Sequence, residues 1–346
     1  MSLVVTVAAT ESYCYAMKTL GRRVAANVFA AGITEPGVAI IAGDNSRQVK
    51  DAVKSWKESL PANWTITHLN AGEEKPDEPN YKIAAQMLIA TLRGAAFTEA
   101  RRLNPEFCWS LDSDTLPPPN ALGCSMDMLC FDGGYYSVSS CPYPNEAFLG
   151  GRGTQFNTIA QDYIEDERIL TDELKAERIA LEAEIKRLND EKVKDLPQEF
   201  KDRRKKYDEA VNKCPPDGNV FQVIAKHGWR RRGWFETAYP GIGKGSVVPS
   251  DWCGFGCTLM NPQALSLANF EGYDGQGTED LYVVWRRWWP AGLRINCIPH
   301  CPCDHVMWAK KKGGSPDEYT LILSLHETQG ECIGHLRTMK QPWREI

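Results

Sequence analysis

The chain has 346 residues, of which 42% are hydrophobic and 25% are charged, and its formal net charge is −5 at pH 7. These proportions are typical of a globular protein with a sizeable core, and the acidic balance argues against a general nucleic-acid coat protein. No run of about 18 apolar residues is present, so we expect no membrane span, and the N-terminus lacks the features of a secretion signal.

The first hundred residues alternate between apolar stretches and amphipathic ones. Residues 3–8, 38–42 and 64–69 predict strands, and helices are predicted after the first two strands and from about 81 to 102. This alternation indicates βαβ units and an α/β fold with a mostly parallel sheet. No Gly-x-Gly-x-x-Gly motif follows the first strand, so a nicotinamide or flavin site is not expected.

The next apolar run, residues 107–111, predicts a buried strand that ends at Asp112, Ser113 and Asp114. Three prolines follow and force the chain out of regular structure. Ligands of open α/β sheets bind beyond the carboxyl ends of the strands, where two carboxylates can hold a divalent cation and, through it, a diphosphate. The alternative is a solvated turn that caps a helix starting at Asn120.

Twelve cysteines are present, and most of them stand singly in apolar or mixed surroundings. This is typical of buried free thiols, so we expect a reducing, cytoplasmic compartment, or the host cytoplasm if the protein is viral.

The composition changes sharply between residues 161 and 213, which are dense in charged side chains. Leu174, Leu181 and Leu188 recur every seven residues there, which predicts an antiparallel helical hairpin that turns near residues 194–197. We interpret it as an insertion between two halves of one α/β domain, residues 1–160 and residues 214–346. It is either a salt-bridged arm without chemistry, a dimerisation element, or a support for a large acceptor, which the basic residues at 201–206 favour.

Residues 226–235 combine basic and aromatic side chains, among them Arg230 and Trp234, and a glycine-rich stretch at 239–246 has the composition of a lid. A turn containing Trp252 and Gly254 then leads towards a further strand. Thr278 is a candidate helix cap that places Glu279 and Asp280 in a first turn. Those acids either complement the helix dipole or supply a general base.

Strands are also predicted at 135–139 and 293–298, and the latter precedes a segment rich in cysteine and histidine that includes His305. The capping-box pattern of residues 315–318 predicts a last helix that runs through about Leu325.

In order and spacing, these features resemble the nucleotide-sugar-dependent glycosyltransferases of the GT-A fold, and glycosyltransferase family 2 in particular. The resembling parts are residues 6–10, Asp44, residues 80–82, residues 111–114, residues 252–256, residues 277–280 and His305. They cover the whole chain except the hairpin, and they imply that residues 1–160 form the nucleotide-sugar-binding half and residues 214–346 the acceptor-binding and catalytic half.

The resemblance implies a metal-dependent transfer of a sugar from a nucleotide-sugar donor to an acceptor hydroxyl, with inversion. The expected Mn²⁺ or Mg²⁺ ligands are Asp114, Asp112 and His305. The expected donor-binding residues are Thr10, Asp44, Lys82, Asp112 and Ser113. Asp280 is the expected base and Glu279 its acceptor-binding neighbour, and the candidate acceptor contacts are Trp252, Gly254, Arg230 and Trp234.

Two other interpretations stay open. The residues Cys297, His300, Cys301, Cys303 and His305, with Cys253 and Cys257 upstream, could hold a structural zinc ion in a scaffold whose GT-A-like domain is inactive. A nucleotidyltransferase also pairs strand-end aspartates with Mg²⁺, although it usually carries a glycine-rich basic loop where this chain has Ala8 to Ser12.

The acceptor is either a glycan or protein hydroxyl, or a hydroxymethylated base in DNA as in phage-type DNA glycosyltransferases. Arginine with tryptophan in residues 226–235 suits phosphate contact and base stacking, but the same residues fit an ordinary exposed turn equally well.

Overall fold

The structure, a computed structural model, describes residues 2–11, 14–71, 81–130, 133–143, 170–191, 193, 195–211, 213–214, 248–250, 252–308, 320–328 and 331–339. Arg230, Trp234, the glycine-rich stretch and the predicted capping box at 315–318 lie outside these residues. No helix in the described part is both long and apolar enough to cross a membrane.

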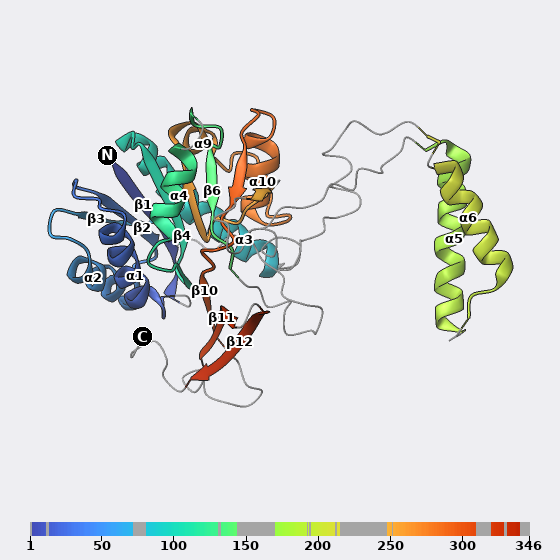
Figure 1. Ribbon diagram of the computed structural model, residues 1–346, viewed down its shortest axis with the longest axis horizontal. Helices are drawn as coiled ribbons and strands as arrows, with labels where there is room; N and C mark the ends of the chain where they lie inside the picture. Colours follow the sequence, from blue (N-terminus) through green and yellow to red (C-terminus); the bar gives the residue numbers. More distant parts are fainter. Residues whose placement is uncertain are drawn as a thin grey trace. The chain divides into compact units, whose positions relative to one another are not determined.

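An eight-stranded sheet forms the centre of the main unit (Figure 1). Its spatial order is β3 (Thr65–Asn70), β2 (Val38–Gly43), β1 (Leu3–Ala9), β4 (Phe107–Asp112), β8 (Cys257–Met260), β6 (Val138–Ser140), β9 (Ile295–Cys297) and β7 (Val248–Ser250). The pairs β3–β2, β2–β1, β1–β4 and β6–β9 are parallel, whereas β4–β8, β8–β6 and β9–β7 are antiparallel. The predicted fold class, a mixed and mostly parallel sheet flanked by helices, is confirmed.

The flanking helices form two groups. In the first, α1 (Met17–Ala30) contacts α2 (Arg47–Ser59) and α4 (Ala121–Cys130); in the second, α3 (Tyr81–Leu103) contacts β1, β2, α9 (Pro262–Leu267) and α10 (Glu279–Val283). A π-helical turn, η4 (Val284–Trp288), continues α10.

The alternation of β1 explains how the sheet is covered. Leu3, Val5, Val7 and Ala9 join one large core cluster with α1, α2 and α4. Successive side chains of a strand point to opposite faces, so Thr6, which contacts the Cys108 thiol, points to the other face. Both faces of β1 are therefore buried, as its nearly continuous apolar sequence requires.

A second sheet has the order β12 (Glu331–Met339), β11 (Thr320–Thr328), β10 (Asp304–Trp308) and β5 (Thr115–Leu116). The prediction of a last helix through Leu325 is wrong, because residues 320–325, the described part of that segment, lie in strand β11. Leu321, Leu323 and Leu325 recur every second residue, which is the period of a strand, and β11 pairs along its whole length with β12. The strands predicted at 135–139 and 293–298 are shorter in the structure, as β6 and β9.

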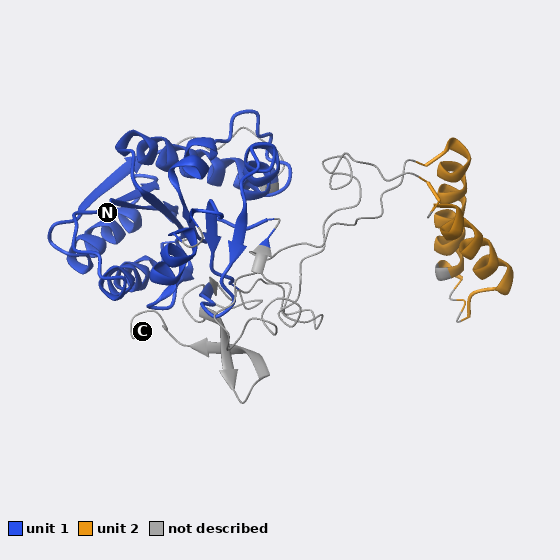
Figure 2. Ribbon diagram, turned by 45° about the horizontal axis from the view of Figure 1, so that its top comes forward, with its two compact units in different colours: residues 1–161, 231–346 blue, residues 162–230 orange. Residues whose placement is uncertain are grey.

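The chain divides into two compact units, residues 1–161 with 231–346, and residues 162–230 (Figure 2). The second contains the predicted helical hairpin, formed by α5 (Asp172–Asp190) and α6 (Gln198–Val211). Leu181, Leu188, Phe200 and Tyr207 make its small core. Arg203, one of the basic residues of α6, pairs with Glu177 at 2.5 Å and with Glu184 at 2.9 Å, so part of the basic cluster is neutralised within the hairpin.

Candidate active site

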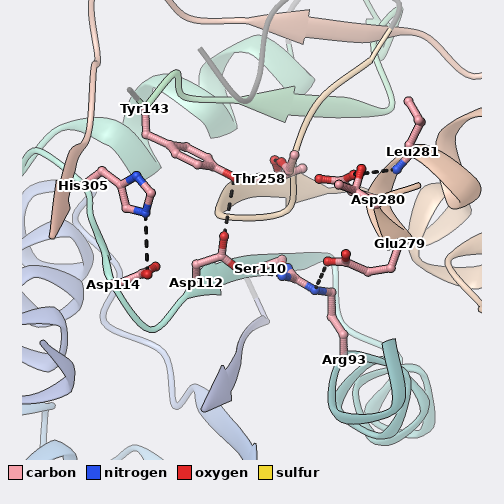
Figure 3. A network of polar contacts seen from close by, with 12 residues as sticks. Arg93, Ser110, Asp112, Asp114, Tyr143, Thr258, Glu279, Asp280, Leu281 and His305 are labelled. Carbon is pink, nitrogen blue, oxygen red and sulfur yellow. Dashed lines mark hydrogen bonds and ion pairs between the residues drawn. The ribbon is translucent and has the colours of Figure 1, made fainter. Parts of the chain in front are cut away.

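Asp112 stands at the carboxyl end of β4 and is held on both carboxylate oxygens (Figure 3). Arg93 of α3 donates from Nη2 to Oδ1 at 2.6 Å, and the Tyr143 hydroxyl donates to Oδ2 at 3.4 Å. Burial and the neighbouring carboxylate of Asp112 raise the pKa of Tyr143, so its hydroxyl stays protonated and able to donate. The Asp112 carboxylate is thus fixed in one orientation.

The same arginine connects Asp112 with a second acidic residue. Its Nε lies 3.2 Å from Oε1 of Glu279, which comes from α10, and its guanidinium also lies over the Phe255 ring. Burial lowers the pKa of Arg93, but Asp112 and Glu279 more than offset this and raise it, so the side chain is charged. Two carboxylates from distant parts of the chain therefore share one buried cation.

Glu279 and Asp280 are both buried, with 5% and 8% of their surface exposed. Burial raises the pKa of Glu279 to about 8, with Arg93 opposing the shift and Asp280 adding to it. Burial likewise raises the pKa of Asp280, although its Oδ1 accepts hydrogen bonds from the Thr278 hydroxyl and from the Leu281 N–H. Thr278 occupies the predicted capping position, but its hydroxyl binds Asp280 and makes no capping bond.

Asp114 and His305 meet on the other side of Asp112 (Figure 3). His305 Nε2 lies 3.5 Å from Asp114 Oδ2, although the two residues are far apart in sequence. Strand β10 brings them together: its His305 pairs with Thr115 of β5, and the Val306 N–H donates to the Asp114 carbonyl at 2.8 Å.

The adjacent carboxylate and imidazole fit two ligands of a divalent cation such as Mn²⁺ or Mg²⁺. Asp112 does not complete a three-residue set with them. Within the described residues, one group of three possible metal ligands has all its ligand atoms within 4.8 Å of one another, and that group contains none of Asp112, Asp114 and His305. In this structure the Asp112 oxygens instead face Arg93 and Tyr143.

Part of the predicted donor-binding set lies at the same edge of the sheet. Ala8 pairs with Asp112, and Ala9 with Gly43, so Thr10, Asp44 and Ser113 all follow strand ends at that edge. Asp44 accepts from the Glu11 and Ser46 N–H groups at 3.1 and 3.0 Å. Partial burial raises its pKa, but these bonds lower it below the ordinary value. Lys82 lies in the first turn of α3.

The predicted acceptor contacts are not assembled in the described residues. Trp252 is buried, with 1% exposure, and the Gly254 carbonyl accepts a hydrogen bond from the Thr258 hydroxyl at 2.6 Å. Gly256 nearby has a clear steric reason to be glycine, because a Cβ there would lie 2.6 Å from Asp112 Oδ2 and from the Tyr143 ring.

Sequence reasoning missed Arg93 and Tyr143. The one available signal for Arg93 was its position as a single charge inside an apolar stretch of the long helix, since a buried arginine requires an acidic partner. Tyr143 carried no comparable signal.

Comparisons with known proteins give distant likenesses. No protein-family model matches the chain, and no curated protein does either. Among solved structures, S. aureus TarS residues 1–349 is 20% identical over 49% of this chain and 40% of its own, with a TM-score of 0.30. GalNAc-T7 with UDP, GalNAc and Mn²⁺ is 12% identical over 91% of this chain and 46% of its own, with a TM-score of 0.42. CMP:2-keto-3-deoxy-manno-octonic acid synthetase with CTP is 8% identical over 86% of this chain and 89% of its own, with a TM-score of 0.36.

WbbM, a bifunctional glycosyltransferase, is a further structural neighbour, 10% identical over 82% of this chain and 37% of its own, with a TM-score of 0.33. The chain spans less than half of TarS 1–349 and of GalNAc-T7. At TM-scores below 0.5, these likenesses do not choose between enzyme classes, so the chemistry of the site has to do so.

Proposed function

We propose that the protein is a metal-dependent glycosyltransferase that moves a sugar from a nucleotide-sugar donor to an acceptor hydroxyl. The observation that carries this proposal is the pairing of Asp114 with His305, 3.5 Å apart, beside the carboxylates of Asp112 and Glu279, which Arg93 links. A cation-binding pair next to a carboxylate with a raised pKa supplies the two functions that a sugar transfer needs, namely a place for the diphosphate and a base.

The donor side of the site is the edge formed by the ends of β1, β2 and β4. Asp114 and His305 would hold Mn²⁺ or Mg²⁺, which when bound neutralises charge on the leaving nucleotide diphosphate. Thr10, Asp44, Lys82 and Ser113 are the residues proposed to contact the nucleotide. Asp112, kept in place by Arg93 and Tyr143, offers its remaining accepting capacity to a ribose hydroxyl.

The base in this proposal is Asp280. Its Oδ1 is held by Thr278 and Leu281, which fixes the carboxylate so that Oδ2 can receive the proton of the acceptor hydroxyl. Glu279 binds the acceptor while Arg93 keeps it close to Asp112. Attack from the face opposite the diphosphate inverts the anomeric carbon.

The acceptor is proposed to be a glycan or protein hydroxyl, or a hydroxymethylated base in DNA. Salt separates the two. DNA binding weakens steeply as salt rises because counterions are released, whereas binding of a neutral glycan is nearly independent of salt.

The test is release of nucleoside diphosphate from a panel of nucleotide sugars, with Mn²⁺ and then with EDTA. We expect slow metal-dependent hydrolysis in the wild type and in Asp127→Ala, a control at an exposed carboxylate of α4, and its loss in Asp114→Ala and His305→Ala. Addition of glycan and DNA acceptors then identifies the one that accelerates turnover. Absence of binding to every nucleotide sugar, or release of pyrophosphate from nucleoside triphosphates instead, would overturn the proposal.

A further inference from the structure

A second group of metal-binding side chains lies away from the aspartates. One sulfur of Cys124, one of Cys301 and one imidazole nitrogen of His300 all lie within 4.8 Å of one another. Cys124 is on α4, and the other two are in the turn between β9 and β10. Cys301 is buried, and the other two side chains are half-buried.

We propose that Cys124, His300 and Cys301 form a structural zinc site. In a tetrahedral site with Zn–S bonds of about 2.3 Å, two sulfur ligands are about 3.8 Å apart. The observed separations, none above 4.8 Å, need a contraction of about 1 Å or less to reach that geometry. Two thiols and an imidazole are ligands that zinc prefers over Mn²⁺ or Mg²⁺.

The surroundings of these ligands support a metal. The Nδ1 atom of His300 is buried and makes no well-formed hydrogen bond among the described residues, although the imidazole interacts with the Cys301 sulfur. A buried polar atom in this state is costly unless something else binds it. The Asn120 amide donates to the Cys124 sulfur at 3.8 Å, as outer-shell groups do for metal-bound thiolates. The Cys141 thiol interacts with that of Cys301.

The chemistry of binding is balanced. Zinc displaces one proton from each of Cys124 and Cys301, so two thiolates and a neutral imidazole neutralise the 2+ charge and two protons are released. Neither oxidant nor reductant is needed.

The position of this site suits a structural role, which differs from the role proposed for the Mn²⁺ or Mg²⁺ ion at Asp114 and His305. Cys301 lies just before β10, the strand that carries His305 to Asp114. A zinc ion would therefore tie α4 to the turn that places His305. The inference does not depend on the proposed transferase activity, because the zinc ligands and the donor-site residues are different.

The test uses the full chain, reduced and stripped of metal, with Co²⁺ as a spectroscopic probe. We expect one Co²⁺ to give the intense thiolate-to-metal charge-transfer absorption that oxygen and nitrogen ligands alone do not produce, and Zn²⁺ to displace it. Cys124→Ser and Cys301→Ser should lose this absorption. Cys130→Ser, at an exposed cysteine of the same helix, and Asp114→Asn should keep it.

A second measurement needs no variant. With Zn²⁺ bound, alkylation followed by mass spectrometry should show Cys124 and Cys301 protected and Cys130 labelled. Absence of the charge-transfer band in the wild type would overturn the proposal. So would equal labelling of Cys124 with and without Zn²⁺, or a Cys124–Cys301 disulfide in protein purified without reductant.

Discussion

Replacement of Arg93 by methionine tests the central arrangement of the site. The guanidinium has 6% of its side chain exposed and lies 2.6 Å from Asp112 and 3.2 Å from Glu279. Methionine fills similar space but leaves both carboxylates without their cation. Removing one partner of a buried ion pair costs about 3–5 kcal/mol. We expect a loss of about 3 kcal/mol at pH 7, the lower end, because Glu279, with a pKa of about 8, is already mostly protonated at that pH and Asp112 is the charge that loses its partner.

The assay is urea unfolding in EDTA, with Arg102→Met as the matched control. Arg102 is on the same helix and pairs with Glu99, but it is exposed, so its loss should have little effect on stability. In the double variant Arg93→Met/Asp112→Asn, part of the lost stability should return, because the carboxylate left without its cation is gone. The reasoning is refuted if Arg93→Met costs no more than the control, or if the effects of the two substitutions simply add.

Substitutions at Gly256, Glu279 and Leu181 test three other parts of the structure. Gly256→Ala forces the new Cβ against Asp112, so it should lower the free energy of unfolding by about 1–3 kcal/mol and reduce turnover. Gly123→Ala, where the nearest atom to a new Cβ is 3.9 Å away, should change neither. Unfolding and activity assays compare the two variants. The Glu279 pKa of about 8 lies above its ordinary 4.5, so the stability that this residue contributes is full below pH 4.5 and is lost as the pH rises through 8. In EDTA, the unfolding midpoint of the wild type should therefore fall more between pH 5 and pH 9 than that of Glu279→Gln. An equal fall in the two proteins would contradict the raised pKa. Leu181 has 1% exposure in the hairpin core, so Leu181→Ala should destabilise the hairpin unit by about 3 kcal/mol and leave donor hydrolysis unchanged. Limited proteolysis and the hydrolysis assay measure these two effects. Loss of hydrolysis would instead assign the hairpin a part in catalysis.

Local sequence patterns were sufficient for the parts of the fold that depend on local order. The apolar run at 107–111 became β4, and the leucines seven residues apart became α5. The last helix was predicted wrongly because a capping pattern is a local signal, whereas β11 is decided by its pairing with β12. Cross-strand pairing of this kind depends on residues that sequence inspection cannot bring together.

The candidate site was predictable to the same extent. The acids Asp112, Asp114, Glu279 and Asp280 were identified because each follows a strand end or begins a helix. Arg93, the cation that Asp112 and Glu279 share, was not identified, because it reaches both carboxylates only after α3 has packed beside α10. Similarly, His300 and Cys301 were noted as neighbours in sequence, but their partner Cys124 lies on a helix from the first half of the chain.

The strand pairing around β9 has a consequence for how this chain accommodates its second unit. Ser140 at the end of β6 and Val248 at the start of β7 are both paired with Cys297, on opposite sides of β9. Neighbouring strands are about 4.8 Å apart, so the two ends are about 10 Å from each other, a gap that about four extended residues can bridge. The segment that contains the helical hairpin therefore leaves and re-enters the sheet at one place. A glycine-serine linker that starts after Tyr143, which is kept because it donates to Asp112, should be able to replace the hairpin without changing the order of the strands.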